Sequence, residues 1–234
     1  MNARLIKHRL KKLRNRHTAE VLRRFFKTGP GEYGEDDIFL GIQVPVLRKI
    51  AGEYEDLPLH EVKELLTSPV HEERLLSLLL LIRAYTNGTN RRKRRIYMLY
   101  LNNVHHINSW DLVDISAEHI VGAYLRDKSR NTLYRLAKSH RIWSRRIAML
   151  ATFHFIKQGE FNETLKVAGL LLSDKEDLIH KAVGWMLREV GKRDQRTEED
   201  FLARHYKSMP RTMLRYAIER FPEPLRTKYL RGEV

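Results

Sequence analysis

Apolar residues recur at three- and four-residue spacings along nearly the whole chain, and stretches of strict alternation are scarce. This period is that of an amphipathic helix, so the pattern predicts an all-α protein. Glycine and proline fall between the periodic segments, where helices are expected to end. The expected helices of one set cover residues 72–84, 110–124, 143–157, 180–190 and 210–221, and their partners cover residues 59–67, 92–102, 130–139 and 163–172.

Two helices recur roughly every 35 to 40 residues, which is the period of HEAT-like repeats. Such helix pairs stack on their neighbours, and one helix of each pair lines a concave surface. We therefore expect a single domain over residues 1–234, a HEAT-like helical-repeat solenoid (an α-α superhelix) with a basic concave groove. A plain helical bundle is the alternative, because no sequence word repeats.

Four conspicuous side chains follow this period. Arg74 and Trp110 are 36 residues apart, Trp110 and Arg146 are again 36 apart, and Arg146 and Trp185 are 39 apart. If the repeat holds, they occupy equivalent places on successive inner helices. A line of alternating cations and aromatic rings suits nucleic acid, since cations meet phosphates and rings meet sugars or bases.

The charge favours the same partner. Lys and Arg number 44 against 29 acidic residues, giving a formal net charge of +15 on 234 residues. Such an excess indicates an anionic partner, and a polyphosphate rewards many cations at once through counterion release. A basic protein that is merely soluble is the alternative, and an acidic membrane surface is a more distant one.

The chain contains no cysteine, which excludes disulfides, thiolate zinc sites, iron–sulfur clusters and a cysteine nucleophile. Its longest apolar run, residues 75–82, is too short to span a membrane. Residues 2–16 are basic but lack the apolar core of a signal peptide. We expect a soluble, cytoplasmic monomer that does not bind membranes.

Trp110 and Asp114 are four residues apart and share one face of a helix, which Asn108 or Ser109 is expected to cap. A carboxylate in a basic groove repels DNA unless it has a role there. The sequence therefore makes Asp114 a candidate catalytic residue. The alternative is that Asp114 only forms an ion pair with Arg146.

Arg145 and Arg146 are adjacent and point about 100° apart on a helix, so one of them can face the groove and bind a phosphate. Lys181 lies one turn before Trp185 and adds a second candidate phosphate contact. Gly184 predicts close approach by another helix or by a ligand. Trp185 taken alone is as compatible with the core as with a site.

Three glycines surround Tyr33 in the segment 29–45, which predicts an aromatic side chain presented on a loop. The acidic run 35–37 lacks the spacing of an EF-hand, and His105-His106 has no third ligand at a recognisable distance. No phosphate-cradling Gly-x-x-x-x-Gly-Lys pattern occurs. We expect no metal or other cofactor, with a metal enzyme as the alternative.

Several segments together resemble the DNA alkylation repair family of AlkD-type glycosylases. They are residues 29–35 (Gly-Pro-Gly-Glu-Tyr-Gly-Glu), 39–45 (Phe-Leu-Gly-Ile-Gln-Val-Pro), 110–114 (Trp-Asp-Leu-Val-Asp), 145–148 (Arg-Arg-Ile-Ala) and 181–189 (Lys-Ala-Val-Gly-Trp-Met-Leu-Arg-Glu). Each is modest alone, but their order and spacing are specific, and the resemblance extends over most of the chain.

The resemblance implies a HEAT-like fold and the excision of N3- and N7-alkylated purines from double-stranded DNA, without a metal or cofactor. It implies that Asp114 is the catalytic aspartate, that Trp110 and Trp185 embrace the lesion nucleotide, and that Arg146 holds DNA. Tyr33 matches a loop tyrosine with no firm role. A non-catalytic DNA-binding or scaffolding repeat protein, and a solenoid that binds RNA or an acidic protein, are the alternatives.

Overall fold

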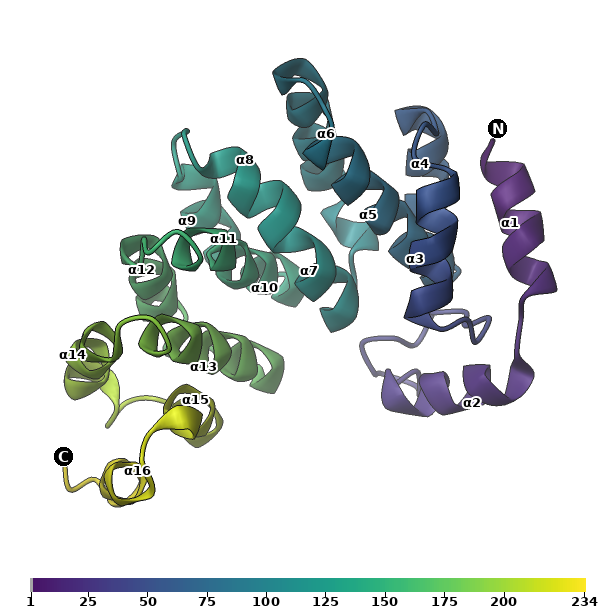
Figure 1. The fold of residues 1–234 in the computed structure, drawn as a ribbon. Coiled ribbons are helices and arrows are strands. Elements are labelled where there is room, and N and C mark those ends of the chain that lie inside the picture. Colours follow the sequence, from purple (N-terminus) through teal and green to yellow (C-terminus); the bar gives the residue numbers. More distant parts are fainter. Residues whose placement is uncertain (1) are drawn as a thin grey trace. The chain divides into compact units, whose positions relative to one another are not determined.

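The computed structural model describes residues 2–234, and they form the all-α helical-repeat fold that the periodicity predicts (Figure 1). The described residues include no β-strand, only an isolated bridge between Ile38 and Val70. None of the described helices is long and apolar enough to cross a membrane. The chain divides into two compact units, one ending at Ile120 and the other running from Val121 to Val234.

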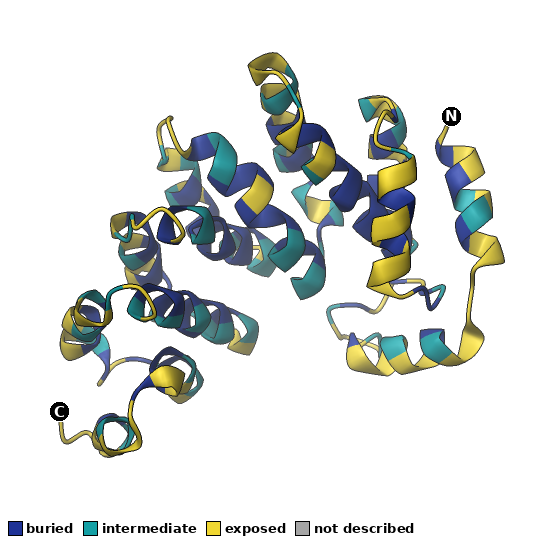
Figure 2. Cartoon of the chain, viewed as in Figure 1, coloured by how far each residue is buried: buried dark blue, intermediate teal, exposed yellow. Residues whose placement is uncertain are grey.

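The first unit is organised around α5, which contacts the helices on either side of it in the sequence. Its run of leucines from Leu75 to Leu81 is buried on every side, and Figure 2 shows the helix dark blue along most of its length. A helix that is apolar all round belongs in a core. The helices of this unit are α1 (Ala3–Lys12), α2 (Arg16–Phe25), α3 (Val44–Glu53), α4 (Leu59–Leu66), α5 (His71–Thr86), α6 (Asn90–Asn102), the 3₁₀ turn η1 (Val104–His106) and α7 (Trp110–Ala117).

The second unit is organised around α13, which packs on α10, α12, α14 and α15. Its closest partner is α15, and Gly184 lies at that contact. A Cβ atom there would lie 2.4 Å from the carbonyl oxygen of Met213. The helices of this unit are α8 (Ala123–Leu125), α9 (Asn131–Ala137), α10 (Ile142–Ala151), α11 (Phe153–Ile156), α12 (Asn162–Leu170), α13 (Asp177–Gly191), α14 (Gln195–His205), α15 (Arg211–Ala217), the 3₁₀ turn η3 (Ile218–Arg220) and α16 (Glu223–Arg231).

Every helix expected from the periodicity is present, but three are not single regular helices. The helix expected over 143–157 is divided into α10 and α11, and the one expected over 210–221 ends in the 3₁₀ turn η3. The helix expected over 110–124 changes to a π-helical turn, η2 (Glu118–Gly122), between α7 and α8. Ser109, one of the two expected caps, occupies the N-cap position of α7, but its side chain makes no capping hydrogen bond. Asn108 instead donates to Asp37. Helices α1, α2, α3, α14 and α16 are not among the expected ranges.

Candidate functional site

Helix α7 carries Trp110 in its first turn and Asp114 one turn later, on one face, as the spacing predicts. Both side chains are half-buried, whereas Leu112 and Val113 between them are fully buried. The helix is therefore fixed in the core by its apolar residues. Trp110 and Asp114 are held on a rigid element at the edge of that core.

Asp114 lines an open hollow of about 570 Å³ within the first unit. The wall is apolar where Leu79, Ile82 and Ile115 line it, and basic where Arg48 and Arg83 do. Arg83 forms an ion pair with Glu55 at 2.8 Å, and its side chain keeps an exposed fraction of 44%. Ala51 and His119 complete the lining. A carboxylate and two guanidinium groups thus share one hollow.

Asp114 also lies near the buried hydroxyl of Tyr100. Burial raises the pKa of Tyr100 above its ordinary value, a hydrogen bond with Ser116 opposes the rise, and the charge of Asp114 adds to it. The phenol therefore stays neutral and bonded to Ser116, whose hydroxyl in turn donates to the carbonyl oxygen of Leu112. These contacts fix the back of α7 beneath Asp114.

Trp110 belongs to a cluster of aromatic rings. Its indole stacks on Phe26, with ring centroids 5.4 Å apart and planes 18° apart, and meets the edge of Phe25 at 5.7 Å. Phe26 stacks in turn on Phe39. Phe25 is 61% exposed, so the edge of the cluster presents an apolar ring to solvent beside Trp110.

A buried charge network lies directly beneath this cluster. The Nδ1 of His71 is 3.1 Å from Asp37 and its Nε2 is 2.8 Å from Asp111. Arg74 forms an ion pair with Asp37 at 2.7 Å, and Asn108 donates to the other oxygen of that carboxylate. The network joins the loop before α3, the start of α5 and the first turn of α7. It therefore fixes the position and orientation of the turn that carries Trp110.

The contacts within this network shift the pKa values of His71 and Asp37. Burial lowers the pKa of His71, but its hydrogen bonds with Asp111 and Asp37 outweigh burial and raise the pKa to about 9. Burial opposes ionisation of Asp37, yet the hydrogen bond from His71 and the charge of Arg74 lower its pKa below the ordinary value. The imidazolium of His71 and the carboxylate of Asp37 are therefore charged together at neutral pH.

Arg74 is one predicted DNA contact that this geometry corrects. Its side chain is 3% exposed, pairs with Asp37 and donates to the carbonyl oxygen of Ser68 at 2.9 Å. A guanidinium so enclosed is not presented to a phosphate. Arg74 instead neutralises a buried carboxylate, which is the usual condition for burying charge.

Glu72 holds the Phe-Leu-Gly-Ile segment that the sequence singled out. Its carboxylate accepts hydrogen bonds from the backbone N–H groups of Leu40, Gly41 and Ile42, at 2.7 to 3.2 Å. Gly41 has a φ of +80°, and a Cβ atom there would lie 2.1 Å from the carbonyl oxygen of Asn15. Glycine is required because the loop passes so close to the start of α2.

Tyr33 lies half-buried in the loop between α2 and α3, as expected of a loop aromatic. The acidic side chains around it bind backbone: Glu32 accepts from the N–H of Gly29 and Glu35 from that of Gly31. The carboxylates thus close the loop on itself. Among residues 2–234, no group of three or more potential metal ligands converges.

In the second unit, Arg146 is 5% exposed and donates to the carbonyl oxygen of Leu178 at 2.5 Å. Arg145 is more fully committed, since it binds the Asp174 carboxylate and the carbonyl oxygens of Ser139 and His140. As a correction to the predicted phosphate contacts, both arginines here tie neighbouring segments of this unit together. Neither guanidinium group is accessible at the surface for a two-point contact with a phosphate.

Lys181 and Trp185 occupy successive turns of α13, as predicted. Lys181 pairs with Asp177 at 2.7 Å, and its side chain remains 40% exposed. The hydrogen bond with Asp177 raises its pKa, so the amine stays charged. Trp185 is half-buried, with its ring 6.2 Å from that of Phe153, and it hydrogen-bonds to Glu189. These two side chains remain the accessible candidates of this unit.

The comparisons with known proteins bear on the family and on the fold. A family profile for DNA alkylation repair enzymes matches residues 6–221. The chain belongs to the DNA alkylation repair enzyme family. A solved structure described as a predicted DNA alkylation repair enzyme from Enterococcus faecalis matches with a TM-score of 0.70 and 16% identity, covering 90% of this chain and 97% of that one. No curated protein sequence matches significantly.

Sequence reasoning missed four residues of this DNA alkylation repair enzyme that lie beside the predicted ones. Arg48, Arg83 and His119 share the hollow of Asp114, and Phe25 lies against Trp110. The repeat contained the signal for three of them, because Arg48, Arg83 and His119 follow each other at 35 and 36 residues. The spacing contains no such signal for Phe25, since the exposure of its ring depends on the orientation of α2 in the folded chain.

Proposed function

We propose that this DNA alkylation repair enzyme is a glycosylase that hydrolyses the N-glycosidic bond of N3- and N7-alkylated purines in duplex DNA. The observation that supports the proposal most directly is the carboxylate of Asp114, which lines an open basic hollow and shares a helix face with Trp110. DNA is a polyanion, so cations are expected at a site that binds it. A carboxylate held among cations, in a member of a DNA repair family, is therefore compatible with a reaction on DNA.

The chemistry of the lesion requires few catalytic groups. Alkylation at N3 or N7 makes the purine cationic, so the base leaves as a neutral molecule and no general acid is needed. The bond between C1′ and the purine nitrogen breaks, its electron pair goes to the purine, and positive charge develops on the deoxyribose. Water then adds to C1′ and releases a proton. The reaction requires no metal or redox cofactor.

Asp114 acts in this scheme by stabilising the oxocarbenium-like sugar and by orienting the water. The indole of Trp110 adds to the effect, because an aromatic face stabilises a cation by about 0.5–2 kcal/mol. Arg48 and Arg83 bind the flanking phosphates. In the second unit, Lys181 and Trp185 serve as further contacts to the DNA backbone.

The experiment is base release from duplex DNA that carries a single N7-methylguanine or N3-methyladenine, followed under single-turnover conditions. Asp114→Asn keeps the shape of the side chain and removes its charge, so we expect at least a 100-fold slower release, the usual scale for losing one electrostatic stabiliser. Affinity for undamaged duplex should stay equal or rise, because a carboxylate no longer faces the phosphates.

Asp56→Asn is the matched control, since Asp56 is an exposed aspartate of the same unit that lies outside the hollow. The control variant should excise at the unaltered rate. Release by Asp114→Asn at that same rate would refute the catalytic role. Tight duplex binding by the unaltered protein without any base release would favour the alternative, a non-catalytic DNA-binding protein.

A further inference from the structure

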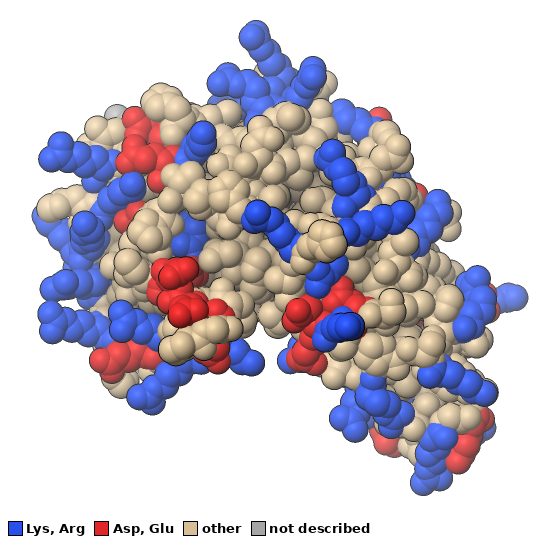
Figure 3. Space-filling model, turned by 180° about the vertical axis from the view of Figure 1, so that it is seen from behind, with Lys and Arg blue, Asp and Glu red and all other residues tan. Residues whose placement is uncertain are grey.

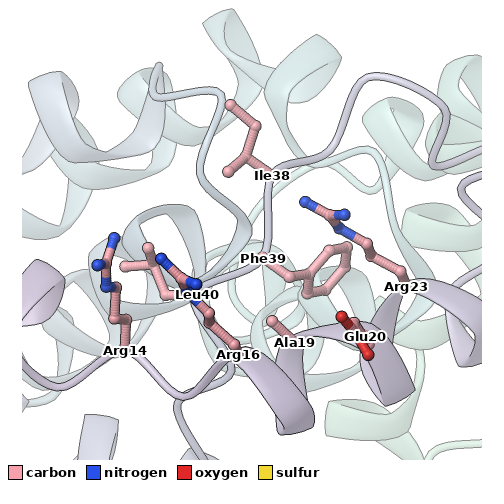
Figure 4. Close-up of a pocket in the computed structure, with 8 residues that line it drawn as sticks. All are labelled: Arg14, Arg16, Ala19, Glu20, Arg23, Ile38, Phe39 and Leu40. Carbon is pink, nitrogen blue, oxygen red and sulfur yellow. The ribbon is translucent and has the colours of Figure 1, made fainter.

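A second basic hollow lies in the first unit, at the start of α2. It encloses about 360 Å³ between α2 and the segment of residues 38–40. Figure 4 shows the guanidinium groups of Arg14 and Arg16 on one side and that of Arg23 on the other, with the ring of Phe39 between them. Ala19, Glu20, Ile38 and Leu40 complete the lining.

The walls of this hollow are held in place from behind. The backbone N–H of Asn15 donates to the carbonyl oxygen of Leu40 at 2.8 Å, and the Asn15 side chain caps α2. The amides of the Phe-Leu-Gly-Ile segment are bound by Glu72. The backbone of these walls is therefore ordered before a ligand enters, so binding need not order it.

The cations around it are not neutralised within the protein. Arg14, Arg16 and Arg23 are all exposed. Among residues 2–234, no carboxylate lies within ion-pair distance of their guanidinium groups, in contrast to Arg74 and Arg83. Three positive charges and one carboxylate, Glu20, leave the hollow with a clear excess of positive charge above an apolar floor.

The hollow and Trp110 lie at the two ends of one stack of rings. Phe39, which lines the hollow, stacks on Phe26 at 5.3 Å, and Phe26 stacks on Trp110 at 5.4 Å. The ring centroids of Trp110 and Phe39 are therefore no more than about 11 Å apart, which is at most about three base-pair rises of roughly 3.4 Å. A DNA strand that meets Trp110 is thus within a few nucleotides of the hollow.

We propose that this hollow binds one phosphodiester group and its deoxyribose, no more than about three nucleotides along the strand from the nucleotide that meets Trp110. This inference rests on the proposed function, because it takes duplex DNA as the substrate. The guanidinium forks match phosphate oxygens, and Ile38, which is 46% exposed, offers an apolar surface to the sugar beside the buried ring of Phe39. The volume lies at the lower end of the range for small-ligand sites, which suits one nucleotide unit.

The test is the salt dependence of binding to an undamaged, fluorescein-labelled duplex. Each phosphate that the protein neutralises contributes about 0.9 to the magnitude of the slope of log K against log salt. Arg16→Ala combined with Arg23→Ala should therefore lower that magnitude by about 0.9, because the hollow holds one phosphate. Lys11→Ala combined with Arg24→Ala is the matched control, because it removes the same charge from α1 and α2 outside the hollow.

An equal loss of slope in the two double variants would overturn the proposal, since it would mean that only the general field of the protein acts. Competition by a free mononucleotide at low millimolar concentration would also overturn it, because the hollow would then be a pocket for a small molecule. Glu20→Gln should strengthen duplex binding, as it removes a negative charge beside the phosphate. The measurement uses undamaged DNA, so a protein that binds but excises nothing fails the proposed function and still passes this test.

Discussion

Gly184 and Gly169 are both helical glycines, but their surroundings are opposite. A Cβ atom on Gly184 would lie 2.4 Å from the Met213 carbonyl oxygen and 2.5 Å from the Tyr216 Cβ, whereas one on Gly169 would meet nothing within 4 Å. Gly184→Ala should therefore lower the free energy of unfolding by about 1–3 kcal/mol, because α13 and α15 must move apart.

Gly169→Ala is the control for that prediction. It should raise the free energy of unfolding by about 0.5–1 kcal/mol, since alanine is the better helix former in the open. Chemical denaturation of both variants checks the pair. Equal effects would show that the contact between α13 and α15 is looser than the structure has it.

The residue scale is also where sequence reasoning had its narrowest reach. The period of 36 residues related Arg74, the fourth residue of α5, to Trp110, the first residue of α7, but it did not say which way either side chain points. Arg74 lies in the core and Trp110 at its edge. The same period contains Arg48, Arg83 and His119, which share the hollow of Asp114. Spacing identifies equivalent positions, whereas burial is set by the neighbouring helices.

At the scale of elements, the charge network beneath Trp110 predicts a dependence of stability on pH. The pKa of His71 is about 9 in the folded chain against an ordinary value of 6.5. Its contribution, roughly 3 kcal/mol, is complete below pH 6.5 and is lost as the pH rises through 9. The Tm should fall across this window, and His71→Gln should have a lower Tm with a flatter profile.

Glu198 on α14 contributes a trend of the same sign from the second unit. Burial, together with the charge of Glu199, raises its pKa from 4.5 to about 9. Between pH 4.5 and 9 the buried carboxyl stays protonated whereas the unfolded chain ionises, so the fold loses stability as the pH rises through this range. Glu198→Gln should therefore raise the Tm at neutral pH, whereas His71→Gln lowers it. Tm scans from pH 6 to 9.5 separate the two.

Elements were the level at which the sequence was most informative. Apolar periodicity located the helices around α5 and α13, because a core-facing stripe is written directly in the residues. It missed α2, whose ten residues include only one buried side chain, Ala19. It also missed the π-helical turn Glu118–Gly122, since one extra residue in a turn leaves the apolar pattern nearly unchanged.

At the scale of the whole molecule, the net charge of +15 predicts strongly salt-dependent association with DNA. Figure 3 shows lysine and arginine side chains spread over the visible face, with acidic ones in smaller groups. If about six phosphates are contacted, affinity for undamaged duplex should fall roughly 10³-fold between 50 and 200 mM salt. Titrations at four salt concentrations measure it, and a flat response would contradict a phosphate-based interface.

Charge alone did not indicate where a polyanion binds. Many cations of this chain are already used internally, as Arg74, Arg145 and Arg146 illustrate. Others, such as Arg91, Arg92 and Arg95, line a separate hollow beside the start of α6. Composition counts all of them equally. Only the folded chain separates a guanidinium that neutralises a buried acid from one that faces solvent.

The carboxylate of Glu72 has a consequence for how this sequence can change over generations. Three amides of the loop are held by one side chain on α5, and amides are present whatever residues the loop contains. Selection on the shape of the loop therefore falls largely on position 72 and on Gly41. A substitution of Glu72 alters, at a distance of some 30 residues along the chain, the segment on which Trp110 and the N-terminal hollow both depend.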